Sequence, residues 1–135
     1  SKEGGSWLLL SPRSAPHCRP MPTSPLLDLT RAQEFAFEEA QLRELVVTFE
    51  QSLVQEMAVI QAGLAAGDAL KVEHALHALK GFMPLFCHPD LAQAMVDLYQ
   101  MSREQPFEAT QARFRVLEPS FLALQKEVKA WLGAL

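Results

Sequence analysis

The sequence of 135 residues lacks the features that mark several large classes of protein. It holds only two cysteines, Cys18 and Cys87, which are too few for a disulfide scaffold and fit a reducing compartment. No apolar run approaches the roughly 20 residues of a membrane-spanning helix. The N-terminal apolar patch Trp7–Leu10 is also too short for the core of a signal peptide. We therefore expect no direct contact with a membrane.

An excess of basic charge is also missing. Twelve Lys and Arg residues stand against 16 Asp and Glu residues, so the net charge is −4. A mildly acidic chain attracts nucleic acid poorly, and no nucleic-acid partner is expected. The sequence also has no glycine-rich phosphate loop, no nucleophile elbow and no clear pair of catalytic carboxylates.

The first 25 residues differ in composition from the rest of the chain. Five of the nine prolines lie there among serine and arginine residues, and three basic residues with one acidic residue give a charge of +2. No apolar period is present, so this stretch cannot bury enough surface to offset the entropy of an ordered chain. Residues 1–25 are therefore predicted to be a Pro/Ser-rich linker or disordered tail, and residues 26–135 the folded domain.

Beyond residue 25 the apolar residues recur at spacings of three and four, which is typical of amphipathic helices. Four long stripes are present, over residues 42–64, 72–86, 91–98 and 114–135. A short first helix is also expected, because Thr30 followed by Gln33 resembles a capping box. The sequence thus predicts an all-α fold, an up-and-down four-helix bundle with a short extra N-terminal helix.

Signals for helix ends lie between these stripes. Gly63 and Gly67 are expected to weaken and then end the first long helix. Asp68 suits the N-cap of the next helix, and Pro89 suits the first position of the one after it. The pair Gln105-Pro106 should end that third long helix.

The most informative stretch for chemistry is His74-Ala-Leu-His77-Ala-Leu-Lys80-Gly81. Since the leucines of this helix face the core, His77 and Gly81 should point away from it. Glycine inside a helix costs about 1 kcal/mol relative to alanine, but it lets another protein approach His77 closely. Lys80 places a positive charge near anything bound to the imidazole. A nucleophilic histidine that accepts a phosphoryl group needs these features.

The run His77-Ala-Leu-Lys80-Gly81 resembles the H-x-L-K-G signature of histidine-containing phosphotransfer (HPt) domains, and the resemblance extends over residues 26–135. It implies a four-helix bundle in which His77 takes a phosphoryl group from the aspartate of one response-regulator receiver domain and passes it to another. It also implies a carrier without an ATP site or cofactor of its own, since any Mg²⁺ belongs to the receiver partner.

The resemblance further implies a polar side chain on the next helix that hydrogen-bonds the second ring nitrogen of the histidine. A hairpin that turns near residue 88 places Tyr99 or Gln100 opposite His77, and Tyr99 is the slightly better candidate. The receiver is expected to dock on the same face, with contacts that include Leu70, His74 and Pro84.

The sequence departs from the family pattern just after the signature. Phe82 and Met83 stand where small residues are usual, and Cys87 stands where a glycine is common. Pro84 is unusual inside the predicted helix over residues 72–86, because it removes a backbone donor at the C-terminal end of that helix. These departures concern the shape of the docking surface rather than the chemistry of the histidine.

Other interpretations of the same residues remain. His74 is a rival acceptor, although Lys and Gly do not follow it at the signature spacing. A metal site of His74, His77, Cys87 and His88 is not expected, because the last two should lie about 15 Å further along the helix axis. The second functional class is a helical protein-interaction or docking module without phosphotransfer.

The chain begins at Ser1 and ends soon after the last apolar stripe. With the Pro-rich start as an interdomain linker, we expect the C-terminal module of a hybrid sensor histidine kinase, at the cytoplasmic end of a membrane-anchored bacterial protein. A stand-alone relay protein fits almost as well. No additional apolar face demands a dimer, so a monomer is expected.

Overall fold

The computed structural model describes residues 25–134. The predicted linker, residues 1–25, lies outside this range apart from Pro25, and so does Cys18. The described helices are α2 (Thr30–Gln33), α3 (Glu39–Ala66), α4 (Ala69–Phe82), the short 3₁₀ helix η2 (Met83–Leu85), α5 (Pro89–Glu104) and α6 (Phe107–Gly133).

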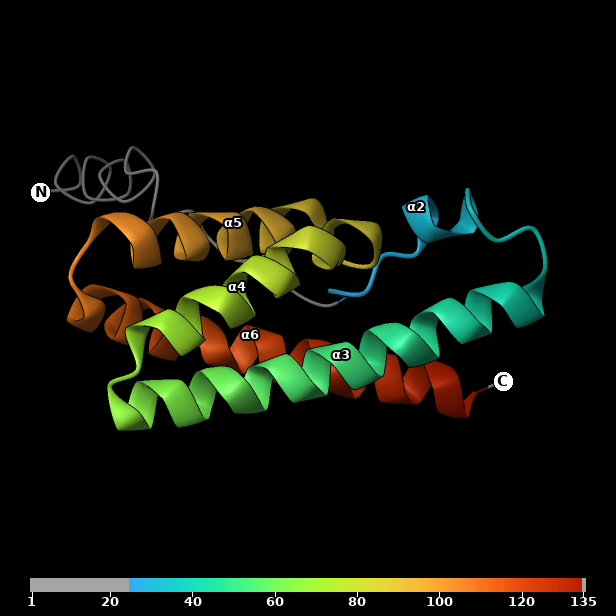
Figure 1. Ribbon diagram of the computed structural model, residues 1–135. Coiled ribbons are helices and arrows are strands. Elements are labelled where there is room, and N and C mark those ends of the chain that lie inside the picture. Colours follow the sequence, from blue (N-terminus) through green and yellow to red (C-terminus); the bar gives the residue numbers. More distant parts are fainter. Residues whose placement is uncertain (1–24, 135) are drawn as a thin grey trace, which may run out of the picture.

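The four long helices run alternately up and down (Figure 1). Helix α3 packs against α4 and α6, and α5 packs against the same two helices, so that the four surround one core. The short α2 lies against η2 and α3 at one end of the bundle. The predicted all-α bundle with a short N-terminal helix is confirmed.

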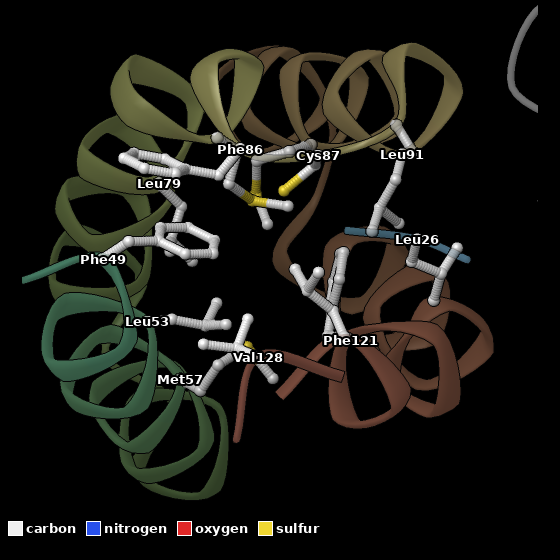
Figure 2. Close-up of a cluster of buried hydrophobic side chains, with 14 of the residues drawn as sticks. Leu26, Phe49, Leu53, Met57, Leu79, Phe86, Cys87, Leu91, Phe121 and Val128 are labelled. Carbon is white, nitrogen blue, oxygen red and sulfur yellow. The ribbon is translucent and has the colours of Figure 1, made fainter. Parts of the chain in front are cut away.

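The core is built from the predicted apolar stripes. Figure 2 shows side chains of all four long helices directed toward the centre of the bundle. Phe49 of α3 stacks on Phe86 with ring centroids 4.4 Å apart, and Phe82 meets Phe49 edge-on at 5.6 Å. These contacts pack the end of α4 against α3, and they favour one orientation of α4 about its own axis.

Most of the predicted helix ends are confirmed. Gly67 ends α3 in the left-handed conformation, with φ of 71°. The Asp68 side chain accepts a hydrogen bond from the backbone N–H of Lys71 at 3.1 Å, and Pro89 is the first residue of α5. Helix α5 ends at Glu104, directly before the predicted stop.

The predicted capping box at the start of the short first helix is wrong. Thr30 is itself the first residue of α2, and its backbone N–H donates to the Asp28 carboxylate at 3.0 Å. This hydrogen bond, with a second one from Thr30, lowers the pKa of Asp28. A capping box occurs instead at the start of α3, between Glu38 and Gln41.

Helix α4 is shorter than the sequence predicts. The apolar stripe continues to Phe86, but the α-helix ends at Phe82 and η2 follows it. Pro84 has no backbone N–H to donate to an earlier turn, which explains the change of helix type there. The placement of Pro84 inside the predicted helix over residues 72–86 is therefore wrong, although Phe86 remains buried as its position in the stripe predicts.

A segment before α2, residues 25–29, crosses the turn between η2 and α5, and we call it the N-terminal strap. The Asp28 N–H donates to the Phe86 carbonyl and the His88 N–H donates to the Leu26 carbonyl, both at 2.8 Å. On the other side, a carboxylate oxygen of Glu127 in α6 accepts the N–H groups of Leu26 at 2.6 Å and Leu27 at 2.8 Å. The strap thus joins the α4–α5 turn to α6.

The guanidinium of Arg31 in α2 adds to this junction. It donates to the backbone carbonyl of Pro84 and, at 2.6 Å, to that of Cys87. These carbonyls have no α-helical donor because the chain turns at this point. Arg31 therefore links α2 to the end of η2 and stabilises the turn that leads into α5.

Candidate functional site

One face of α4 carries the predicted acceptor. Leu70, His74, His77 and Gly81 follow one another at spacings of four, three and four, and all four are exposed. We call these residues the α4 face. Pro84 in η2, three residues further on, is also exposed. The predicted acceptor thus shares one solvent-facing line with Leu70 and His74, whereas Pro84 borders a separate groove with Arg31 of α2 and with residues of α5.

Gly81 leaves space beside the imidazole. A Cβ atom built on it would have no atom of the described residues within 4 Å, other than its own helix backbone and chain neighbours. Leu70, at the other end of the face, is 61% exposed. The α4 face thus offers an apolar side chain and an open backbone on either side of two imidazoles.

Helix α5 brings Tyr99 to His77. The two ring centroids are 5.3 Å apart and the ring planes are inclined at 54°. The tyrosine contacts the imidazole with its ring, and no hydrogen bond joins the two side chains in the described structure. The expected pairing of these residues is therefore found, but the expected hydrogen bond to the second ring nitrogen is not.

Gln100 does not take that position either. Its amide donates to the Glu104 carboxylate on the same helix at 2.6 Å, and within residues 25–134 it forms no hydrogen bond to His77. One residue along an α-helix turns the side chain by about 100°, so the position after Tyr99 faces another direction. The expected hydrogen bond from Gln100 to the imidazole is thus not found among the described residues either.

Lys80 lies over the same tyrosine. Its Nζ atom is 5.1 Å from the centroid of the Tyr99 ring, and the side chain is half-buried. An ammonium group is attracted to the face of an aromatic ring, which limits how far this flexible side chain moves. The cation is therefore held beside the ring that contacts His77.

The sequence interpretation missed two charged residues near this site. The guanidinium carbon of Arg103 lies 5.9 Å from the Tyr99 ring centroid, and its Nε atom lies 4.0 Å from the carboxylate of Glu73. Glu73 stands four residues before His77, and Arg103 stands four residues after Tyr99. Residues four apart share a helix face, so the spacing of Glu73 from His77 and of Arg103 from Tyr99 indicates in the sequence that both lie near the site.

An open groove of about 420 Å³ borders the α4 face. Its floor and walls come from α3 and from the first half of α4. The lining residues are Glu56, Val59, Asp68, Leu70, Lys71, His74 and Ala75. The groove thus extends the exposed surface around His74 toward α3.

The other reactive groups of the region do not join the site. Cys87 is fully buried, and this burial raises the pKa of its thiol, so the thiolate form is suppressed. Among the described residues, no three His, Cys, Asp or Glu side chains are grouped so as to hold a metal ion.

Within residues 25–134, no helix is both long and apolar enough to span a membrane.

Comparison of the chain with family models, with curated proteins and with solved structures gave no match.

Proposed function

We propose that this chain is a histidine-containing phosphotransfer domain of a His–Asp phosphorelay. In this proposal His77 accepts a phosphoryl group from a response-regulator receiver domain and passes it to a second one. The observation that carries the proposal is the exposed imidazole of His77, with the open backbone of Gly81 one turn further on and the Lys80 ammonium on the adjoining ring.

In the proposed transfer, the lone pair of one ring nitrogen of His77 attacks the phosphorus of an aspartyl phosphate. A nitrogen–phosphorus bond forms while the bond between phosphorus and the acyl oxygen breaks, and that electron pair leaves with the aspartate carboxylate. The other ring nitrogen keeps its proton. Onward transfer is the reverse step on the aspartate of the second receiver.

The neighbouring residues have separate roles in this reaction. Lys80 attracts the phosphoryl oxygens, which carry negative charge throughout the transfer. Gly81 leaves room for the receiver loop around its aspartate. Leu70 and His74 on the α4 face provide docking contacts, and the exposed Pro84 beyond the end of α4 adds another. The chain needs no cofactor in this scheme, and Mg²⁺ is supplied by the receiver.

We also propose a cytoplasmic location, either as a module of a hybrid sensor histidine kinase or as a stand-alone relay protein. Receiver domains, which the reaction requires as partners, work in that compartment. The buried free thiol of Cys87 is compatible with a reducing environment.

The decisive experiment compares His77→Gln with the matched control His74→Gln. Both proteins are exposed to a panel of phosphorylated receivers and to phosphoramidate, a small phosphoryl donor that needs no docking surface. Site-resolved mass spectrometry should find acid-labile phosphate on residue 77 in the wild type and in His74→Gln, and receivers should transfer at least a hundredfold less phosphate to His77→Gln. All three proteins should have the same thermal unfolding midpoint, because both histidines are exposed.

Phosphate transferred by a receiver to His74 would contradict the assignment of the acceptor. Receivers that bind without transferring phosphate, together with no labelling by phosphoramidate, would instead favour the helical docking module. The exposed α4 face and its groove are compatible with that second function, so the experiment measures binding and transfer separately.

A further inference from the structure

The Tyr99 ring gathers charged groups from two helices. Its centroid lies 5.3 Å from that of the His77 ring, 5.1 Å from the Lys80 ammonium and 5.9 Å from the Arg103 guanidinium carbon. Arg103 is also paired with Glu73. We call these five residues the Tyr99 cluster. It brings two cations to the ring that contacts the proposed acceptor, and a carboxylate to one of these cations.

We propose that Glu73 and the phosphoryl group on His77 compete for Arg103. In the unphosphorylated protein Arg103 pairs with Glu73, and on phosphorylation it turns to the phosphoryl oxygens. This inference rests on the proposed function of His77. It makes Arg103 a phosphoryl-binding residue and Glu73 a positioning residue that sets how readily the imidazole gains the group and gives it up.

The pair between Glu73 and Arg103 is suited to exchange. The closest nitrogen–oxygen distance is 4.0 Å, and the side chains are 32% and 56% exposed, respectively. Exposed ion pairs of this kind contribute little to stability because water and salt screen them. Arg103 can therefore leave Glu73 at small cost.

A phosphoryl group on His77 offers Arg103 a stronger partner. It carries about two negative charges, and the planar guanidinium matches phosphate oxygens through paired hydrogen bonds. Both side chains lie within 6 Å of the Tyr99 ring centroid, so the guanidinium starts close to the imidazole that would carry the phosphoryl group.

Glu73 has the opposite effect on the phosphoryl group. It lies one helical turn before His77, where side chains are neighbours, so its carboxylate repels an incoming phosphoryl group. As long as it holds Arg103, it also withholds the second cation. Loss of the Glu73 charge should therefore favour acceptance by His77, whereas loss of the Arg103 charge should oppose it.

A purely structural role of the pair gives a different expectation. If Glu73 and Arg103 only link α4 to α5, then removing either one breaks the same link. Glu73→Gln and Arg103→Gln would then change phosphorylation in the same direction. The sign of the two effects thus distinguishes the competition from the link.

The test measures, by site-resolved mass spectrometry, the rate at which His77 of the full chain accepts phosphate from phosphoramidate. We expect Arg103→Gln to lower this rate about tenfold, the loss of one charge-assisted contact, and Arg103→Lys to restore part of it. Glu73→Gln should raise the rate about threefold. Glu44→Gln and Arg115→Gln, on α3 and α6, are matched controls for the change in net charge and should leave the rate unchanged.

A second measurement follows Arg103 directly by the ¹⁵N–¹H signal of its Nε group. The competition predicts a large shift when the wild type is phosphorylated and none in His77→Gln. Equal falls in rate for Glu73→Gln and Arg103→Gln, or rates equal to those of the controls, would overturn the inference while leaving the acceptor assignment in place. A wild type that takes up no phosphate on His77 would refute the proposed function itself.

Discussion

Two helical glycines of this protein occupy opposite surroundings. A Cβ atom on Gly63 would lie 2.7 Å from the Cγ2 atom of Val72, at the contact of α3 with α4. One on Gly81 would meet none of the described atoms within 4 Å beyond its own helix. Close packing against Val72 therefore requires a glycine at position 63, where the sequence predicts only a weakening of the helix before its end. Gly81 has no packing role in the described structure.

The two alanine variants should consequently differ in sign. Gly81→Ala should raise the free energy of unfolding by about 0.5–1 kcal/mol, because alanine favours the helix and meets no neighbour. Gly63→Ala should lower it by about 1 kcal/mol, because the overlap with the stiff Val72 side chain exceeds that gain. Urea denaturation followed by circular dichroism measures both.

The proposed function adds a second expectation for Gly81→Ala. Its new methyl group stands where the receiver approaches, so transfer from a receiver should slow while labelling by phosphoramidate stays at the wild-type rate. A more stable variant with undiminished transfer from the receiver would show that Gly81 does not provide access to His77.

At the scale of elements, the Glu127 side chain links the N-terminal strap to α6. Glu127→Ala removes the acceptor of the Leu26 and Leu27 amides and should lower the free energy of unfolding by about 2 kcal/mol. Glu127→Gln should cost less, since its amide oxygen still accepts hydrogen bonds but carries no charge. Amide hydrogen exchange at the two leucines should accelerate in both variants.

Lys126 supplies the matched control for the strap. It is the exposed neighbour of Glu127 on the same helix, and Lys126→Ala should change stability by less than about 0.5 kcal/mol. If the Leu26 and Leu27 amides exchange at wild-type rates in Glu127→Ala, the strap is held by its pairing with the α4–α5 turn alone.

For the molecule as a whole, stability depends on one continuous core, and Phe49 lies where α3 meets the end of α4. Phe49→Ala removes the stacked contact with Phe86 and the edge contact with Phe82, and should cost about 3–5 kcal/mol. Phe37, which is 91% exposed, is the matched control, and Phe37→Ala should cost less than about 0.5 kcal/mol. Coincident loss of helical circular dichroism and of near-ultraviolet signal would show a single transition. Two separate transitions would contradict one cooperative core.

The sequence by itself determined the features that depend on neighbours along the chain. Stripes at spacings of three and four predict the four long helices and most of their buried residues, because side chains one turn apart share a face. Gly67, Asp68 and Pro89 act within the turn that contains them, and their effects were predictable for the same reason. The exposure of His77 also follows from the angle between this residue and the apolar stripe of its own helix.

Only the tertiary structure decided the contacts between distant parts of the chain. Glu127 meets the Leu26 amide across 101 positions of sequence, and nothing in the local pattern indicates that pairing. The contact of Tyr99 with His77 through its ring, rather than through its hydroxyl, likewise depends on how α4 and α5 are rotated against each other. Packing of the whole core sets that rotation, because it determines which side chains interdigitate, whereas the sequence pattern specifies only the inward face of each helix.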